Sequence, residues 1–474
     1  MNNADTPTTQ ALSTPPGPSG AAPNTCRRAR AQAAGGDPSG ASPLVYTQEL
    51  RPSYSPNGSQ PSESFQVINS ETGEVLEYEQ SGKAGILTPK YTQIDHQNTR
   101  LERFAMRWSL DSLLPYSRQS KCHRFRIPNR EVELKLSLEH EKAFVAGCEV
   151  CGSVWGCPLC APKITERKRI DVEAGMASAK DKDFQVMLAT FTIPHGRGHD
   201  LKQIRAQILK AWRKGSTSRA GKAMRKMIGL RGYIRVVEVT YGANGWHPHF
   251  HVLLIVDTKF TAYEIQQLWY PIWLDGCRKS GLEDPSEAHG VRVDDGARAA
   301  QYVTKWGMDS ELTKGHLKKG KKSVNPWDLL RIYTFGMDGI TPELREVATA
   351  LGIDKKRAGA LWLDFFAAFK GTRQLYWSNG LRDLLGLSEE KTDQEIAEEE
   401  MDPLAGLLAV LTAYWMDIGT TRTLPRVLNR AEDAPSLIPE LLEEIRILAI
   451  EKRKQKEVKY GQKIKEQKGQ LCPV

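Results

Sequence analysis

The chain has 474 residues, a formal net charge of +9, 26% charged residues and 40% hydrophobic residues, an ordinary balance for a globular protein. This length predicts two or three folded units, and the basic charge favours nucleic acid, then anionic membrane, as a partner. Neither an apolar run of about 18 residues nor a charged-then-apolar leader is present, so we expect a cytoplasmic protein without a membrane partner.

Residues 1–95 are rich in Pro, Ser, Gly, Thr, Asn and Gln and contain few large apolar side chains. Such a composition cannot bury enough surface to offset chain entropy, so this segment is predicted to be a disordered N-terminal tail. Within it, residues 71–74 resemble a turn and would allow a short strand pair over residues 64–78.

Four of the eight cysteines form two CxxC pairs in the next segment, residues 96–180, which we interpret as a zinc-binding segment followed by a basic helix. These are Cys148, Cys151, Cys157 and Cys160. Each pair can place two thiolates on one tetrahedral ion, which favours structural Zn²⁺ without an open coordination position. An iron–sulfur cluster or a redox pair remains an alternative, whereas a disulfide framework is not expected from this spacing.

Residues 184–193 form an apolar, β-branched run that predicts a strand ending at Pro194. A direct role for Thr190, Thr192 or His195 at its end is left open. The following stretch, residues 201–227, is predicted to be helical and is strongly basic. Its charged face is either solvated or a track for DNA, and the sequence does not decide between the two.

Residues 233–257 show two alternating apolar runs around a Gly-Ala-Asn-Gly turn, the pattern of a β-hairpin. If Gly242 pairs with Gly245, then Glu238 lies opposite His249. If Asn244 and Gly245 form the loop instead, Glu238 lies opposite His251. In both registers a carboxylate and several imidazoles share one patch of sheet.

His247, His249 and His251 are spaced by two, so a strand places all three on one face. Two imidazoles and one carboxylate make a site for a divalent cation, and an incomplete protein shell leaves room for a substrate phosphate. We therefore predict a Mg²⁺ or Mn²⁺ site formed by His249, His251 and Glu238, with His247 as the alternative third ligand.

A short strand is predicted at residues 291–293, followed by a helix over residues 297–306 that Asp294 or Asp295 can cap. On this helix Tyr302 and Lys305 are three residues apart and share a face. A Tyr-x-x-Lys pattern alone is a weak signal, so its position after the histidine strand carries the interpretation.

The segment WHPHFHVLL around His249 and His251 resembles the second motif of HUH endonucleases, most closely that of rolling-circle plasmid replication initiators of the Rep_1 type. Tyr302 and Lys305 match the third motif of this family, and the strand ending near Pro194 is similar to the first. The tyrosine follows the histidines, as in Rep proteins, whereas conjugative relaxases have the reverse order. Arg298 occupies the position of a glutamate that activates water in some relatives, which puts the termination step in doubt.

The resemblance implies an α+β fold: an HUH core with a central antiparallel sheet of about five strands flanked by helices. It also implies metal-dependent nicking and joining of single-stranded or hairpin origin DNA. Tyr302 would be the nucleophile, forming a 5′-phosphotyrosine, with Lys305 assisting and a 3′-hydroxyl left as primer. An HUH transposase or relaxase, or a non-enzymatic zinc-containing DNA-binding protein, remains an alternative.

The predicted nicking and joining domain spans residues 181–312, and residues 313–388 form a helical C-terminal part of the Rep-like region. Residues 389–474 are expected to be an acidic linker, further helices and a basic tail. In the stretch GHLKKGKKS, Lys322 follows Gly320-Lys321 at the position where a phosphate loop has Ser or Thr, so we do not expect a nucleotide site there. Unwinding by a separate host helicase and synthesis by a host polymerase are therefore expected.

Overall fold

The structure, a computed structural model, describes residues 45–46, 64–68, 75–81, 86–89, 93–257, 259–307, 322–400, 402 and 404–470. It is a mixed α+β protein with three antiparallel sheets and forms two compact units, Met1–Lys90 and Tyr91–Val474. Among the described helices, none combines the length and the apolarity that a membrane crossing requires.

The first unit contains a four-stranded antiparallel sheet in the order β1-β2-β3-β4. Its strands are β1 (Val45–Tyr46), β2 (Ser64–Ile68), β3 (Val75–Ser81) and β4 (Ile86–Pro89). The strand pair predicted over residues 64–78 is therefore present as β2 and β3. Apart from these four strands and the start of α1, the residues of the segment predicted to be disordered lie outside those that the structure describes.

The second unit is built on a six-stranded sheet in the order β10-β7-β9-β8-β11, with β12 also pairing with β8. All the pairings are antiparallel, as predicted. The strands are β7 (Gln185–Phe191), β8 (Leu230–Gly242), β9 (Gly245–Val256), β10 (Val291–Asp294), β11 (Ser323–Val324) and β12 (Leu375–Trp377). The predicted hairpin is the long β8–β9 pair at its centre.

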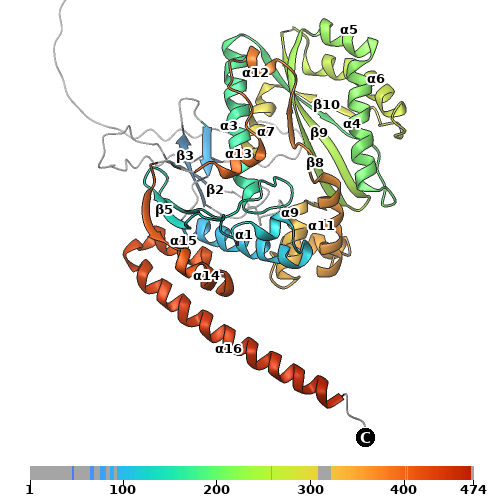
Figure 1. Ribbon diagram of the computed structural model, residues 1–474. Helices are drawn as coiled ribbons and strands as arrows, with labels where there is room; N and C mark the ends of the chain where they lie inside the picture. The colour runs from blue at the N-terminus through green and yellow to red at the C-terminus, as the bar shows by residue number, and fades with distance from the viewer. Residues whose placement is uncertain are drawn as a thin grey trace, which may run out of the picture. The chain divides into compact units, whose positions relative to one another are not determined.

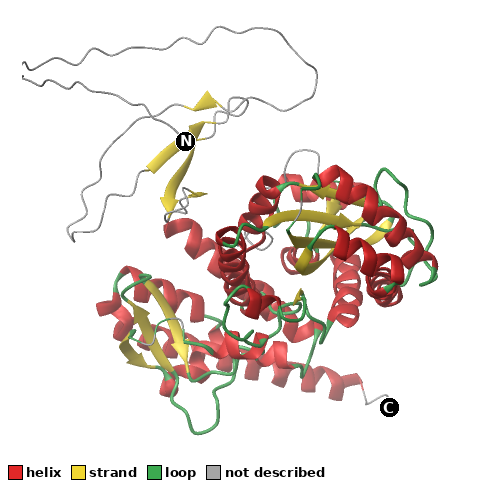
Figure 2. Ribbon diagram, turned by 90° about the horizontal axis from the view of Figure 1, so that it is seen from above, coloured by secondary structure: helices red, strands yellow, loops and turns green. Residues whose placement is uncertain are grey.

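Helices cover both faces of this sheet (Figures 1 and 2). On one face, α4 (Leu201–Thr217) and α6 (Ala262–Arg278) pack with Phe250 of β9. On the other, α3 (Cys160–Asp181) and α7 (Gly296–Gly307) pack over Leu253 of the same strand. Because side chains alternate along a strand, His247, His249 and His251 belong to the α3–α7 face.

A third sheet joins segments that are far apart in the sequence, in the order β13-β5-β6. β5 (Glu133–Ser137) and β6 (Lys142–Ala146) form a hairpin, and β13 (Gly406–Val410) pairs with β5. The C-terminal residues thus share a sheet and a hydrophobic core with the segment that contains the cysteine pairs, although the sequence predicted two separate segments. Strand pairing between residues so distant in sequence leaves no local signal.

The remaining helices belong to the second unit. They are α1 (Gln93–Leu113), α2 (Arg118–Lys121), α5 (Arg219–Met227), α9 (Pro326–Phe335), α10 (Pro342–Ala350), α11 (Lys355–Phe369), α12 (Leu381–Leu384), α13 (Asp393–Glu398), α14 (Trp415–Thr421), α15 (Leu424–Asp433) and α16 (Ile438–Gln470). The acidic stretch predicted as a linker contains α13, which packs on α3 through an ion pair between Asp393 and the buried Lys168.

Candidate metal and nucleophile site

The turn between β8 and β9 sets the register of the site. Gly242 pairs with Gly245, so Ala243 and Asn244 form the loop and Glu238 lies opposite His249. Gly245 has a φ of +86°, and a Cβ atom there would lie 3.1 Å from the Cα of Arg197. A side chain at this position would be strained and crowded, so the observed turn requires glycine there.

Glu238, His249 and His251 form a cluster of possible metal ligands. The Oε2 atom of Glu238 lies 3.5 Å from Nε2 of His249 and 3.3 Å from Nε2 of His251. Metal–ligand bonds of about 2.1 Å place neighbouring donors about 3.0–3.4 Å apart, so these distances suit one divalent cation. All three side chains are partly exposed, which keeps a substrate within reach.

Hydrogen bonds orient both imidazoles toward the cluster. The Nδ1 atom of His251 lies 3.1 Å from the hydroxyl of Thr190, and Nδ1 of His249 lies 3.2 Å from the backbone carbonyl of His247. Occupying Nδ1 in this way leaves Nε2 free to bind a cation. The sequence left open whether Thr190 has a direct role. Its contact with His251 follows from the strand pairing, because Thr190 on β7 lies opposite His251 on β9.

The carboxylate of Glu238 is ionised at neutral pH. Burial alone would raise its pKa, but His251 and His249 outweigh burial and hold the pKa well below the ordinary 4.5. An ionised carboxylate is the form that binds a divalent cation.

His247 does not belong to the ligand cluster. Its ring stacks on that of His195, with the centroids 4.4 Å apart and the planes at 12°. Burial, reinforced by His249 and His195, lowers the pKa of His247 to about 3, so its imidazole is neutral. The structure thus brings Glu238, rather than the alternative His247, together with the two histidines.

Tyr302 lies directly against this cluster. Helix α7 is capped by Asp295, whose carboxylate accepts a hydrogen bond from the backbone N–H of Arg298, as predicted. One turn later the hydroxyl of Tyr302 donates a 2.7 Å hydrogen bond to Oε1 of Glu238, and its ring centroid lies 4.6 Å from that of His251. The two oxygens of one carboxylate therefore face the tyrosine and the histidine pair. The side chain of Lys305 lies outside the described residues.

A second cluster consists of four buried cysteines, and it corrects the predicted ligand set. The sulfurs of Cys122, Cys151, Cys157 and Cys160 all lie within 4.8 Å of one another. Their closest separations are 3.5, 3.7 and 3.8 Å, far longer than a disulfide. A tetrahedron with Zn–S bonds of about 2.3 Å has edges of about 3.8 Å, so the four thiols fit one zinc ion.

Cys148, predicted as a ligand, is replaced by Cys122. Cys148 forms a backbone bridge with Arg126 and packs into the core between the third sheet and the C-terminal helices. Its burial there raises its pKa to about 12, which keeps the thiol protonated. Within the four-sulfur cluster, hydrogen bonds from Cys122 and the other thiols hold the pKa of Cys160 well below the ordinary value.

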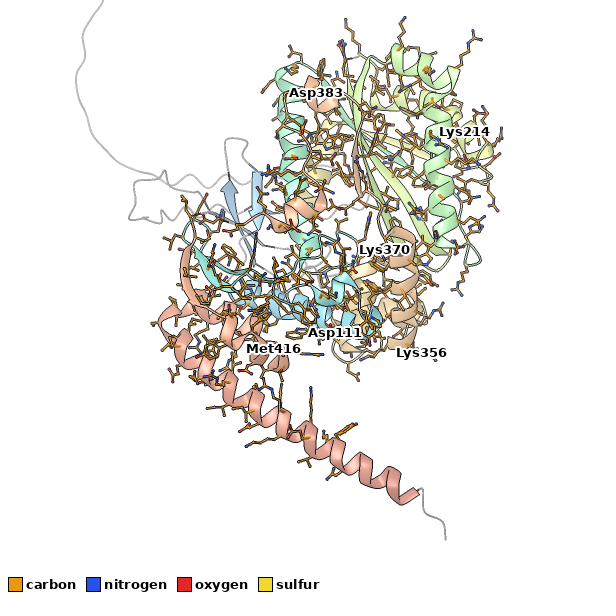
Figure 3. The ribbon with its side chains drawn as sticks, in the orientation of Figure 1. Asp111, Lys214, Lys356, Lys370, Asp383 and Met416 are labelled. Atoms are coloured by element: carbon orange, nitrogen blue, oxygen red, sulfur yellow. The ribbon has the colours of Figure 1, made fainter. Side chains whose placement is uncertain are left out.

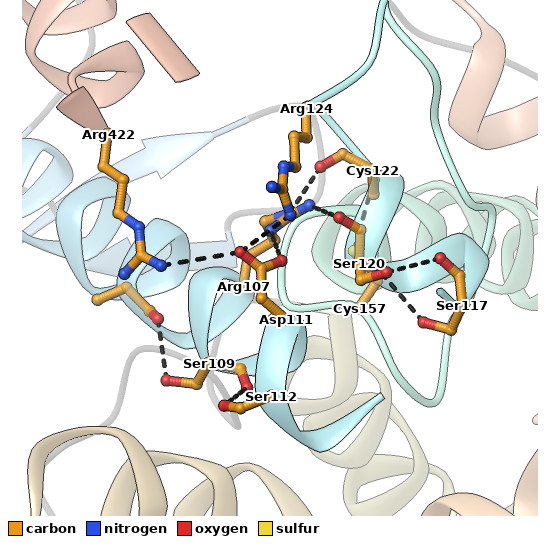
Figure 4. A network of polar contacts seen from close by, with 11 residues as sticks. Arg107, Ser109, Asp111, Ser112, Ser117, Ser120, Cys122, Arg124, Cys157 and Arg422 are labelled. Carbon is orange, nitrogen blue, oxygen red and sulfur yellow. Dashed lines mark hydrogen bonds and ion pairs between the residues drawn. The ribbon is translucent and has the colours of Figure 1, made fainter. Parts of the chain in front are cut away.

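Cys122 is brought to the cluster by a buried arginine (Figure 4). Arg107 is 1% exposed, and its guanidinium donates hydrogen bonds to the backbone carbonyls of Ser120 and Cys122 and to Asp111. This network fixes the end of α2 over the CxxC loops. Cys122 lies 29 residues before Cys151, the next member of the cluster, and an arginine on another helix holds it in place. The sequence therefore contains no spacing pattern that would identify Cys122 as part of the cluster.

Comparison with known proteins identifies the family of the chain. A family model described as a replication protein, Rep_1, matches residues 142–405. The chain is 25% identical over 375 residues to a protein named "Protein rep" from Streptomyces lividans, covering 64% of this chain and 81% of that protein. It is 27% identical over 128 residues to a "Protein rep" from Staphylococcus aureus, covering 25% of this chain and 53% of that protein.

A third relative, "Neomycin resistance protein" from Streptomyces cyanogenus, is 29% identical over 142 residues, which cover 25% of this chain and 32% of that protein. No solved structure matches the chain significantly. The Rep_1 match spans more than half of the chain and includes the histidine strand, the tyrosine helix and three of the four clustered cysteines. The chain therefore belongs to the Rep_1 family of replication proteins.

Proposed function

We propose that this protein initiates rolling-circle replication of a plasmid by nicking and rejoining single-stranded or hairpin origin DNA, with the chemistry of HUH endonucleases. The observation that carries the proposal is the shared carboxylate: Glu238 binds the Tyr302 hydroxyl through Oε1 and faces His249 and His251 through Oε2. A nucleophile and a metal site are thus joined through one side chain.

A Mg²⁺ or Mn²⁺ ion held by Glu238, His249 and His251 would polarise the scissile phosphate and stabilise the charge that develops on it. Tyr302 is the nucleophile: its oxygen forms a bond to phosphorus while the bond to the 3′-oxygen breaks. A phenol has a reference pKa near 10, so the proton has to leave as the bond forms, and Oε1 of Glu238 already accepts it in a hydrogen bond.

The leaving 3′-oxygen takes up a proton and becomes the 3′-hydroxyl that a host polymerase would extend, with a host helicase unwinding the duplex. Attack of a 3′-hydroxyl on the phosphotyrosine reverses the step and rejoins the strand. Lys305, three residues after Tyr302 on the same helix, is proposed to favour the developing negative charge.

The test is cleavage of end-labelled single-stranded DNA containing a plasmid origin, resolved on a denaturing gel. With Mn²⁺ or Mg²⁺ the protein should form a slowly migrating adduct and release a fragment with a free 3′-hydroxyl. Omitting both ions should remove the adduct and adding them back should restore it. A non-enzymatic DNA-binding protein would bind the same DNA without any adduct.

Thr190 provides a graded test of the metal site. The Thr190→Val substitution keeps the shape of the side chain but removes the hydroxyl at 3.1 Å from Nδ1 of His251. Loss of such an outer contact weakens metal binding by about 10–100-fold. We expect that loss in a Mn²⁺ titration, with adduct formation recovering at high Mn²⁺. Unchanged Mn²⁺ affinity would show that Thr190 does not orient the imidazole.

We also propose that Cys122, Cys151, Cys157 and Cys160 bind one structural Zn²⁺. Cys122→Ala should remove the zinc and lower the melting temperature, because three thiolates no longer complete the tetrahedron. Cys148→Ala is the matched control: it removes a buried cysteine next to the cluster and should retain one zinc per chain. The zinc content of both variants is measured by atomic absorption. Loss of zinc in Cys148→Ala but not in Cys122→Ala would contradict the assignment.

A further inference from the structure

A second basic site lies on the face of the central sheet opposite the metal cluster. Side chains of Tyr233 and Arg235 on β8 point away from the face that carries Glu238, because residues alternate along the strand. Together with α4 and Tyr376 of β12 they line a pocket of about 540 Å³.

Four cations line this pocket: Arg205, Lys210, Arg213 and Arg235. Its described lining contains no aspartate or glutamate. None of the four side chains forms an ion pair or hydrogen bond in the described part of the chain, and the Nε atoms of Arg205 and Arg235 are buried without a partner. Buried cationic groups without anions are costly, so the pocket is suited to an anionic ligand that supplies them.

Aromatic rings surround the innermost cation. The guanidinium of Arg235 lies 5.0 Å from the ring centroid of Phe250, 5.2 Å from that of Tyr376 and 5.8 Å from that of Trp212. These rings stabilise the charge that burial disfavours and fix its position. Tyr233 and Tyr376 remain partly exposed at the pocket, so their rings can also contact a ligand.

We infer that this pocket binds one nucleotide unit of a single DNA strand, with the phosphate on Arg213, Lys210 and Arg235 and the unpaired base on Tyr376. A groove that combines cations with aromatic faces is the arrangement that binds single strands, whereas a duplex covers its base faces. That the bound strand is DNA rests on the proposed function. The cations and aromatic rings of the pocket are observed independently of that function. The strand that is nicked beside β9 would thus be held a second time, on the α4 side of the sheet.

The experiment measures binding of a fluorescent oligothymidine by anisotropy, using the full chain with Tyr302→Phe and no added Mg²⁺ or Mn²⁺. No covalent bond then forms, so the result does not depend on whether the protein nicks DNA. The double variant Lys210→Gln/Arg213→Gln removes two exposed pocket cations without disturbing the core. We expect binding about tenfold weaker, and a log–log salt slope smaller by about 1.4.

The matched control is Lys202→Gln/Lys214→Gln, which removes the same charge from the same helix at exposed positions outside the pocket (Figure 3 labels Lys214). Its affinity and salt slope should stay unchanged. Equal losses in both double variants would show diffuse surface charge and overturn the inference.

Two further arms identify the ligand. Tyr376→Leu keeps an apolar side chain but removes the stacking face, and it should weaken binding of oligothymidine about fivefold while an abasic oligomer is unaffected. Unchanged binding of oligothymidine would overturn the base contact. Thymidine monophosphate or inorganic phosphate that competes as well as the oligomer, mole for mole, would overturn the assignment to a strand.

Discussion

Replacing Tyr302 with phenylalanine is expected to abolish the covalent protein–DNA adduct and to lower nicking at least about a thousandfold, while DNA binding persists. The substitution removes a single oxygen, the atom that donates the 2.7 Å hydrogen bond to Glu238. The ring that packs against His251 stays in place, so the metal site should remain intact. The measurement is the rate of adduct formation on labelled single-stranded origin DNA.

The matched control for this variant is Tyr263→Phe, which removes a hydroxyl from an exposed tyrosine on α6, the helix on the opposite side of the sheet. Its adduct yield should equal that of the wild type. An adduct that forms at the wild-type rate in Tyr302→Phe would place the nucleophile elsewhere in the chain, and the mechanism proposed from Glu238 would then fail.

The second large effect is expected from the histidine pair. His249→Ala and His251→Ala each remove one of the three proposed protein ligands, so Mn²⁺ affinity should fall by more than the about 10–100-fold that an outer contact contributes. Because metal binding and nicking share this site, adduct formation should fall with it. Isothermal titration with Mn²⁺ and the adduct assay together measure both effects.

His247→Phe tests whether His247 contributes to metal binding alongside His249 and His251. His247 shares their strand face but stacks on His195 outside the cluster, and a phenyl ring can keep that stacking. Mn²⁺ affinity should not change in this variant. If His247→Phe lost the metal and His251→Ala kept it, the ligand assignment would be wrong.

The local geometry that the sequence predicted is that of elements with local patterns. Period-two histidines can only share a strand face, and a tight glycine turn limits the register to two choices, of which the structure has the one that pairs Gly242 with Gly245. The Asp295 cap and the helix that carries Tyr302 are likewise local. The contact between Tyr302 and Glu238 is not, and only the family resemblance anticipated that these motifs meet.

The parts that the sequence did not predict depend on distant segments. Cys122 joins the other three cysteines because Arg107 on α1 holds its loop, whereas Cys148 follows the chain into a different core. The pairing of β13 with β5 and the docking of α13 on α3 also join residues far apart in the chain. Spacing within a motif carries no information about such contacts.

Tyr302 is proposed to form the covalent bond to DNA, and peptide mapping of the adduct tests this assignment most directly. Trypsin cuts after Arg298 and Lys305, so the peptide AAQYVTK, residues 299–305, contains Tyr302 as its only tyrosine. After nuclease trimming, mass spectrometry should find a nucleotide 5′-phosphate on that tyrosine. A nucleotide on another residue, or a trimmed adduct in which this peptide is unmodified, would contradict the account.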